Sequence, residues 1–307
     1  MFKFGFVALF GRPNVGKSTL LNAILAFKVG IVSAKPQTSW FNVRGIYTDK
    51  EAQIVFIDTP GLHESKKLVN KCLLSASLSA LKEMDAWLYL MDPDLELLKK
   101  DKEWLQVVSG SRKPGICVIN KTDLLKPKEV TMLLESVKEK YASFYILPVS
   151  CLNSLGIEVL LRKIKVLLPE GRPLYDEDML SDSPVRFLAG EFIREKLFEV
   201  LRCEIPYESS VLITEWLERP KGMIVIDAEI WVNRVSQKAI LIGRGGETIK
   251  KIGVKARVDI ESLIGQKVYL NLHVKCKHNW VKSARLLEQA GFLVKSALKE
   301  GKRRVGR

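Results

Sequence analysis

The stretch GRPNVGKS, residues 11–18, is the first place where residue types and spacing indicate chemistry. It fits G-x-x-x-x-G-K-[ST], a pattern whose backbone N–H groups surround a β-phosphate. In this pattern Lys17 reaches the β- and γ-phosphate oxygens, and the Ser18 hydroxyl faces Mg²⁺. An ordinary strand–helix turn is the simpler interpretation, but three elements downstream argue against it. The residues of this loop expected to bind nucleotide are Gly11, Asn14, Val15, Gly16, Lys17, Ser18 and Thr19.

A second element, DTPG, lies at residues 58–61. Asp58 ends the apolar run QIVFID, so its carboxylate is expected at the edge of a sheet beside Lys17. There it can hold Mg²⁺ through water, and the Gly61 N–H can meet a γ-phosphate. D-x-x-G alone is commonly a turn, and it gains weight here from its place after a buried strand.

The third element, NKTD, follows the apolar run GICVI and contributes Asn120, Lys121 and Asp123. The Asp123 carboxylate can accept hydrogen bonds from N1–H and the amino group of guanine. Adenine lacks this donor pair and would leave a buried carboxylate unpaired, so the sequence predicts a guanine nucleotide. A fourth, weaker element is PVSCLNSLG, where the backbone of Ser150 and Cys151 could meet guanine O6.

A segment that could respond to the γ-phosphate is SAKPQTSWFNVRGI. A hydroxyl from Thr38 or Ser39 is expected to complete the Mg²⁺ shell there, although a loop with no ligand is the alternative. Many GTPases place a water-orienting glutamine where this chain has Leu62. The chain therefore has no catalytic glutamine at this position, and His63 beside it is a weak candidate.

A second glycine-rich turn lies in LIGRGGETIKKIG, residues 241–253. Its G-x-x-G matches the turn with which KH modules clamp a nucleic-acid backbone. The motif alone says little, and a capped helix with a solvated basic face is the alternative. Two lysines one turn further on favour phosphate binding. The residues expected to bind RNA are Gly243, Arg244, Gly245, Gly246, Lys250 and Lys251.

Charge is distributed unevenly along the 307 residues, whose formal net charge is +14. From Arg234 to the end there are 18 Lys and Arg against 5 Asp and Glu. Such a block indicates a polyanionic partner, either nucleic acid or an acidic membrane surface. No apolar run approaches the roughly 20 residues of a membrane span. The five scattered cysteines favour a reduced, cytosolic compartment.

Strand–helix alternation over residues 1–170 predicts an α/β domain with a mostly parallel sheet. Three prolines and an acidic cluster within residues 169–184 indicate a linker at 171–184. Residues 185–307 then predict a smaller α+β module of a helix, strands, the glycine turn and a further helix, ending in a basic tail. The runs expected as strands are FGFVALF, QIVFID, AWLYLMD, GICVINK, FYILPVS, SSVLITEWLE, MIVIDAEIWV and KVYLNLHVKCK.

The four nucleotide motifs resemble those of translation-factor-like P-loop GTPases. Over nearly the whole chain the sequence resembles the bacterial Era GTPases, in which a P-loop GTPase domain precedes a type II KH domain. The resemblance is carried by GRPNVGKST, DTPGLH, NKTD, IREKL with EIPY after it, and IGRGGETIKKIG.

This resemblance implies a slow GTPase that uses GTP/GDP and Mg²⁺, binds the 3′ end of small-subunit (16S) ribosomal RNA and assists maturation of the 30S subunit. It implies a short helix at SQKAILI, which by itself suggests a strand, and a potassium ion held by Asn14, with hydrolysis stimulated by RNA and potassium. A cytoplasmic monomer partly associated with the inner membrane is expected.

Two departures from the family pattern affect the expected sites. The family's Q-T-T-R is Gln37-Thr38-Ser39-Trp40 here, which aligns Ser39 with the metal-contacting threonine. The family's S-A-L is Ser150-Cys151-Leu152, which preserves the backbone role. Two other functions remain open, a membrane-associated signalling GTPase and an RNA-binding module with nucleotide as a structural ligand.

Overall fold

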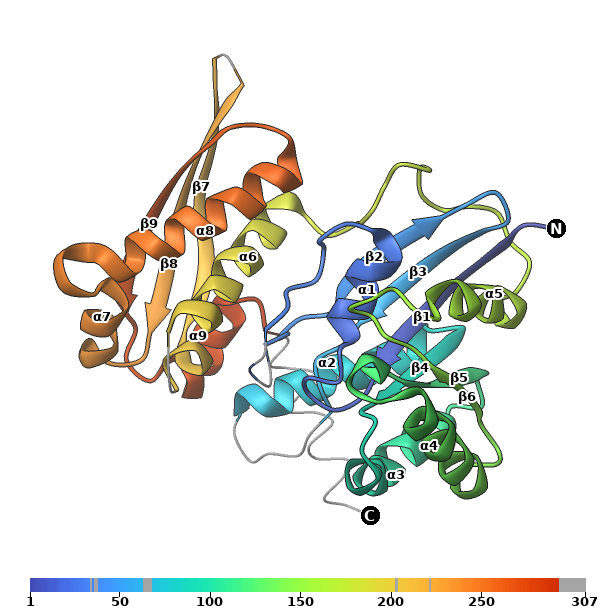
Figure 1. Cartoon of the computed structure of the whole chain (residues 1–307). Coiled ribbons are helices and arrows are strands. Elements are labelled where there is room, and N and C mark those ends of the chain that lie inside the picture. The colour runs from blue at the N-terminus through green and yellow to red at the C-terminus, as the bar shows by residue number, and fades with distance from the viewer. Residues whose placement is uncertain (34, 36–37, 63–67, 202–203, 221, 293–307) are drawn as a thin grey trace. The chain divides into compact units, whose positions relative to one another are not determined.

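The computed structural model describes residues 1–33, 35, 38–62, 68–201, 204–220 and 222–292 (Figure 1). These residues form two compact units, here called the first and second unit. The first takes its residues from Met1–Val32, Ser39–Glu64 and Leu73–Asp182, and the second from Ser33–Thr38, Ser65–Cys72 and Ser183–Arg307. Gln37, His63 and the basic tail lie outside the described residues.

A six-stranded sheet in the order β2-β3-β1-β4-β5-β6 organises the described part of the first unit. All neighbouring strands are parallel except β2 and β3. Apolar residues fill the central strands because helices cover both faces of the sheet. The strands are β1 (Lys3–Phe10), β2 (Val43–Thr48), β3 (Ala52–Asp58), β4 (Ala86–Met91), β5 (Gly115–Ile119) and β6 (Tyr145–Pro148).

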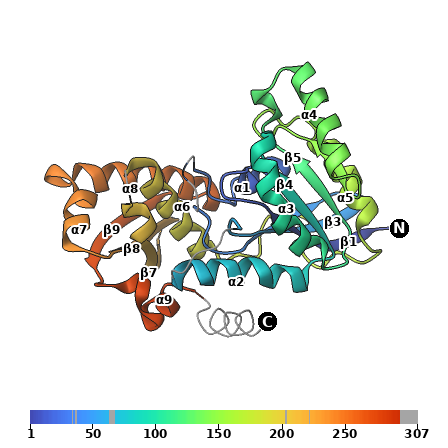
Figure 2. The same cartoon turned by 90° about the horizontal axis from the view of Figure 1, so that it is seen from below.

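Helices of the first unit pack on both faces of this sheet (Figure 2). One core joins Ala80 of α2, Leu105 of α3 and Val137 of α4 to strand residues such as Phe10 and Tyr89. A short 3₁₀ turn, η1 (Thr122–Leu124), follows β5. The helices are α1 (Lys17–Leu25), α2 (Leu68–Glu83, which belongs to this unit from Leu73 on), α3 (Leu95–Ser109), α4 (Pro127–Lys140) and α5 (Ile157–Leu167).

The predicted strands of this unit are all present, and β2 is an additional one. Its first four residues, VRGI, were expected in the segment that responds to γ-phosphate, whereas the structure pairs the strand antiparallel with β3. The segment before Ser183 lies alongside β2, where the Ile46 N–H donates to the Leu180 carbonyl over 2.9 Å. Arg44 of β2 also pairs with Asp182 at 3.1 Å.

The second unit contains a three-stranded sheet in the order β7-β8-β9, with β8 and β9 parallel. Helices α6 and α8 pack on one of its faces, where Ile226, Ala228 and Ile230 are buried (Figure 1). The elements are α6 (Val185–Val200), η2 (Ile205–Glu208), β7 (Ser210–Arg219), β8 (Met223–Val232), α7 (Val235–Ile242), η3 (Arg244–Gly246), α8 (Glu247–Ile264), β9 (Val268–Cys276), η4 (Trp280–Lys282) and α9 (Ala284–Gln289).

The stretch SQKAILI is helical, as the family resemblance implied and periodicity alone did not. The Gln237 side chain caps the start of α7 by accepting the Asn233 and Arg234 N–H groups, each at 2.9 Å. A polar side chain at the third helical position satisfies N–H groups that a helix start leaves unpaired. This cap favours a helix where the apolar pattern suggests a strand.

Candidate functional sites

The phosphate loop connects the end of β1 to the start of α1. Lys17 is buried, and its ammonium group donates to the carbonyls of Gly11 and Arg12, each at 3.1 Å. Burial lowers the pKa of Lys17 to about 8, and the nearby Asp58 carboxylate partly opposes this shift. A cation is thus held beneath the loop, where it can reach phosphate oxygens.

Three side-chain oxygens meet beside this loop. The Ser18 hydroxyl donates to Asp58 Oδ2 and lies 3.1 Å from the Ser39 hydroxyl. The second carboxylate oxygen, Asp58 Oδ1, is buried without a hydrogen-bond partner among the described residues. Burial raises the pKa of Asp58 to about 6, against the opposing charge of Lys17. Hard oxygen donors suit Mg²⁺, and an unsatisfied carboxylate oxygen fits a cation that would bind there.

The structure separates the two switch hydroxyls predicted as metal ligands. Ser39 lies beside Ser18, whereas the Thr38 hydroxyl donates to the Lys35 carbonyl over 2.8 Å. Thr38 is buried in this arrangement. Of the two candidates, only Ser39 lies beside the oxygens of Ser18 and Asp58 that were predicted to hold Mg²⁺.

DTPG lies against the phosphate loop. A Cβ atom on Gly61 would be 2.7 Å from the backbone nitrogen of Pro13, so only glycine permits this approach. The Leu62 N–H donates to the Gly11 carbonyl over 3.1 Å, and its side chain is 2% exposed in the core. Leu62 thus holds the two loops together, and its side chain offers no polar group to a water molecule.

Asn120 connects the base-binding loop to the phosphate loop. Its Nδ2 donates to the Val15 carbonyl over 2.8 Å, and its Oδ1 accepts the Cys151 N–H over 3.1 Å. Only 2% of this residue is exposed. A single carboxamide therefore joins three loops that lie far apart in the sequence.

Asp123 is held in place by the loop after β6. The Ser150 hydroxyl donates to Asp123 Oδ1, which fixes one carboxylate oxygen and leaves the other to accept hydrogen bonds. The Cys151 N–H, expected to meet guanine O6, donates to Asn120 in this structure. The contact of Cys151 with O6 thus stays a prediction, while Ser150 gains a side-chain role that the sequence did not indicate.

In the second unit, the G-x-x-G turn forms η3 between α7 and α8. Gly243, Gly245 and Gly246 all have positive φ angles, of 75°, 59° and 82°, which L side chains rarely adopt. Apart from the glycine itself and its chain neighbours, none of the described residues has a heavy atom within 4 Å of a Cβ built on Gly245 or Gly246. The turn is therefore open enough for a phosphate chain to approach the start of α8.

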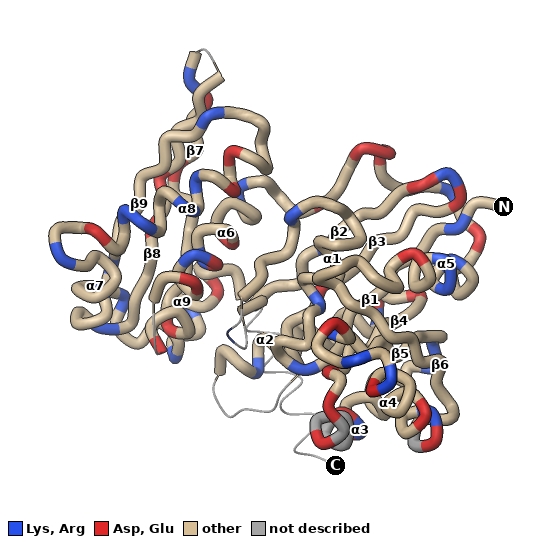
Figure 3. Tube along the Cα trace, viewed as in Figure 1, with Lys and Arg blue, Asp and Glu red and all other residues tan. Residues whose placement is uncertain are grey.

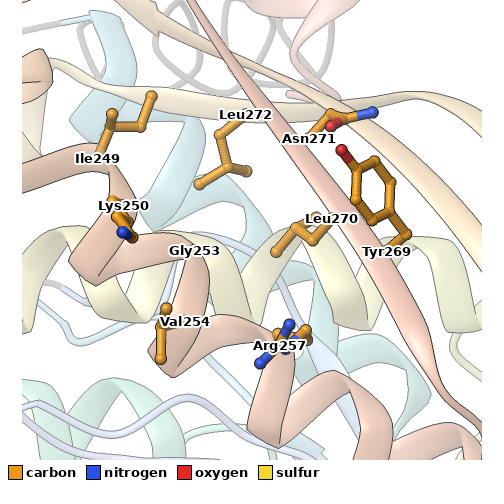
Figure 4. Close-up of a pocket in the computed structure, with 9 residues that line it drawn as sticks. All are labelled: Ile249, Lys250, Gly253, Val254, Arg257, Tyr269, Leu270, Asn271 and Leu272. Atoms are coloured by element: carbon orange, nitrogen blue, oxygen red, sulfur yellow. The ribbon is translucent and has the colours of Figure 1, made fainter. Parts of the chain in front are cut away.

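Lys250 and Lys251 are exposed on the first turns of α8, and Figure 3 shows Lys and Arg along this helix. Next to them a hollow of about 280 Å³ lies between α8 and β9 (Figure 4). Leu270 and Leu272 point from the strand toward the helix, and Lys250 and Arg257 lie on the helix side. This apolar hollow with basic side chains, here called the α8–β9 groove, fits unstacked bases whose phosphates follow the turn.

The groove contains residues that sequence reasoning missed. Tyr269 is 58% exposed, and the Asn271 amide donates to Asp227 Oδ1 over 2.6 Å. An exposed tyrosine within the alternating strand KVYLNLHVKCK was a signal that could have identified one of them. Arg257 and Asn271 carry no such signal, because they line the same hollow only through the packing of α8 on β9.

Comparisons with known families match both units. A family model described as a 50S ribosome-binding GTPase matches residues 6–121. A KH domain model matches residues 204–281. The first match contains the phosphate loop, Asp58 and Lys121, and the second contains the G-x-x-G turn and the groove.

Individual relatives match along nearly the whole chain. The GTPase Era of Thermotoga petrophila is 44% identical, covering 94% of this chain and 97% of that protein. GTPase Era of Geobacter metallireducens is 41% identical over 95% of this chain and 98% of its own.

Two crystal structures are similar at a TM-score of 0.89 and 36% identity. One is a single-residue variant of Aquifex aeolicus Era bound to GDP·AlF4⁻, covering 94% of this chain and 99% of that one. The other is Era in complex with MgGDPNP and nucleotides 1506–1542 of 16S ribosomal RNA, covering 95% and 99%.

Proposed function

The chain belongs to the family of Era GTPases, and from this premise we propose that it couples GTP binding and hydrolysis to recognition of ribosomal RNA. The second unit holds the 3′ end of 16S ribosomal RNA, and the protein assists maturation of the 30S subunit. One observation carries the proposal: the chain combines a complete guanine-nucleotide constellation with an open G-x-x-G turn beside a basic groove.

Support for the nucleotide site comes from the first unit. Lys17 lies under the phosphate loop, Ser18, Ser39 and Asp58 form an oxygen cluster suited to Mg²⁺, and Asp123 is oriented by Ser150. The related Era structures contain GDP·AlF4⁻ and MgGDPNP. GTP, GDP and Mg²⁺ are accordingly the ligands of this site.

Support for RNA binding comes from the second unit. The turn offers backbone N–H groups to phosphates, Lys250 and Lys251 add positive charge, and the α8–β9 groove offers apolar surface to bases. The related Era complex contains nucleotides 1506–1542 of 16S ribosomal RNA. We propose the corresponding segment of ribosomal RNA as the ligand of this unit.

Hydrolysis is proposed to be slow and stimulated by RNA and potassium. Leu62 is buried in the core and cannot orient water. Asn14 is exposed at the mouth of the phosphate loop with a φ of 64°, where its side chain could hold K⁺ against phosphate. A cation at that position would supply the charge that an arginine finger supplies in other GTPases.

We further propose that the GTPase domain spans residues 1–170, the linker 171–184 and the KH domain 185–307. Both family matches lie within these limits, and the compact units change at Ser183. A cytoplasmic monomer with peripheral attachment to the inner membrane is also proposed. Among the described residues, no helix is both long and apolar enough to cross a bilayer.

The proposal is tested by measuring RNA affinity and GTP turnover on the full chain. We expect the 3′-terminal 16S segment to bind more tightly than a scrambled RNA of equal length, with affinity falling as salt rises. We expect faster GTP hydrolysis when this RNA is added and when K⁺ replaces Na⁺.

Other outcomes would favour the alternatives. Tighter binding to anionic vesicles than to either RNA would support a membrane-associated signalling GTPase. A hydrolysis rate indifferent to both RNA and K⁺ would support nucleotide as a structural ligand. Equal affinity for the two RNAs would overturn the proposed recognition.

A further inference from the structure

Arg12, inside the phosphate loop, has a side chain that points away from solvent into a buried cluster. Its Nε donates to Asp101 Oδ1 over 3.0 Å, and Asp101 belongs to α3, far along the chain. The Tyr89 hydroxyl of β4 donates to the same carboxylate oxygen, also over 3.0 Å. Asp101 is 0% exposed. The loop is thus anchored through its own side chain to a carboxylate beneath it.

The Arg12 guanidinium is also connected to the base-binding loop, through a second carboxylate. Arg12 Nη2 lies 4.0 Å from Asp92 Oδ2, just after β4. The other oxygen of Asp92 pairs with the Lys121 ammonium group of NKTD at 2.6 Å. Arg12 and Lys121 therefore share one carboxylate, which joins the phosphate loop to the loop that selects guanine.

A buried ion pair of this kind contributes little net stability to the fold. Removing two charges from water costs free energy that their attraction barely recovers, so an apolar pair of similar volume is often as stable. Here Asp101 Oδ2 and Arg12 Nη2 also have no hydrogen-bond partner within the described part of the chain. An ion pair that adds so little net stability suits a role in fixing geometry.

The Arg12–Asp101 ion pair fixes the main chain of the phosphate loop, which surrounds the phosphates. The Arg12 carbonyl accepts from the Lys17 ammonium group, and the next residue, Pro13, contacts the DTPG loop. Asn14 then adopts a positive φ of 64°. A guanidinium hydrogen-bonded to buried Asp101 and lying 4.0 Å from Asp92 restrains this backbone from two directions.

We propose that Asp101 is a positioning residue for guanine-nucleotide binding, acting through Arg12 on the phosphate loop. The inference rests on the nucleotide site and not on the RNA proposal, so the two can fail separately. Asp101 itself touches no ligand in this role. Its loss should weaken contacts to the phosphates while leaving contacts to the base in place.

The test is Asp101→Asn in the full chain, which keeps the shape of the side chain but removes the buried negative charge that Arg12 Nε contacts. Affinities for GDP and GMP are measured by competition against a fluorescent GDP, at a temperature where circular dichroism shows a folded protein. We expect GDP affinity to fall at least about tenfold and GMP affinity to change much less, because GMP lacks the β-phosphate. Glu103→Gln, an exposed carboxylate on the same helix, is the matched control.

Two further variants separate positioning from folding. The double variant Arg12→Gln with Asp101→Asn should bind GDP no more weakly than Asp101→Asn alone. Both proteins lack the same restraint, the ion pair between residues 12 and 101. If Asp101→Asn does not fold, Arg12→Lys keeps a cation but loses the planar fork, and its ratio of GDP to GMP affinity should still fall. An unchanged ratio in a folded variant, or an equal loss for GDP and GMP, overturns the proposal.

Discussion

The hydroxyl of Ser39 lies 3.1 Å from that of Ser18, the residue whose oxygen also contacts Asp58. Ser18 belongs to the phosphate loop and Ser39 to the segment before β2, so the contact links the two parts that we propose as Mg²⁺ ligands. The neighbouring hydroxyl of Thr38 is engaged with the Lys35 carbonyl. Because Ser39 and Thr38 make different contacts, their alanine variants should behave differently.

Ser39→Ala should weaken Mg²⁺-dependent binding of a non-hydrolysable GTP analogue by about tenfold, since a contact to a charged group is worth about 1.5 kcal/mol or more. GDP affinity should change less, because the switch ligand is needed when the γ-phosphate is present. Thr38→Ala serves as the adjacent control. Calorimetric titration of both variants checks this, and a larger loss in Thr38→Ala would contradict the assignment.

Asp123→Asn should exchange guanine for xanthine specificity. The amide presents a donor where the guanine N1–H and amino group need an acceptor, so GTP affinity should fall by about a hundredfold. Xanthosine triphosphate should bind better to this variant than to the original protein. Ser150→Ala, which only frees the carboxylate, should produce a smaller loss. Unchanged selectivity in Asp123→Asn would refute the guanine site.

Nucleotide affinity should decrease as pH rises above about 8, the pKa of buried Lys17. The ammonium form pairs with phosphate, so binding must take up a proton once the free protein has lost it. The loss should approach about tenfold per pH unit above this value. Calorimetry of GDP binding in buffers of different ionisation enthalpy measures the proton uptake. Affinity that stays constant to about pH 9.5, well above that pKa, would show that Lys17 remains charged.

Replacing Gly245 and Gly246 with Asp should reduce affinity for the 16S segment by at least about tenfold, because two carboxylates would repel the phosphates at the turn. GTP affinity should be unchanged. Gly222→Asp is a close control, since Gly222 has a φ of 75° and open surroundings in the same unit. Fluorescence anisotropy with labelled RNA compares the three proteins. Equal losses in both variants would mean that added charge, and not the turn, explains the effect.

Much of the fold is predictable from the sequence because its strands are apolar on both faces and its loops carry specific chemistry. Asp58 and Asn120 lie at the carboxyl ends of β3 and β5, on the same side of the sheet, as expected. Strand β2 was not predicted, since VRGIYT contains a charged residue and a glycine and lies at the edge of the sheet. Edge strands lack the continuous apolar character that reveals buried ones.

The missed parts of the sites depend on long-range packing. Arg12 occupies a position of the phosphate loop where the motif specifies no residue type, and only α3 reveals its buried partner. The groove likewise arises from α8 lying against β9, which places Arg257 and Leu270 in the lining of one hollow. Periodicity assigns residues to a face of one element, and it does not say which faces of two elements converge.

The two hydrogen bonds of the Asn120 carboxamide have a consequence for the kinetics of nucleotide exchange. Because one rigid group fastens the backbones at Val15 and Cys151, these loops need little ordering when a ligand arrives, and entropy loss on association is small. Release of the nucleotide likewise does not require these two loops to lose their structure. We therefore expect exchange of GDP for GTP to change the contacts of Ser39 more than the position of the backbone at Val15.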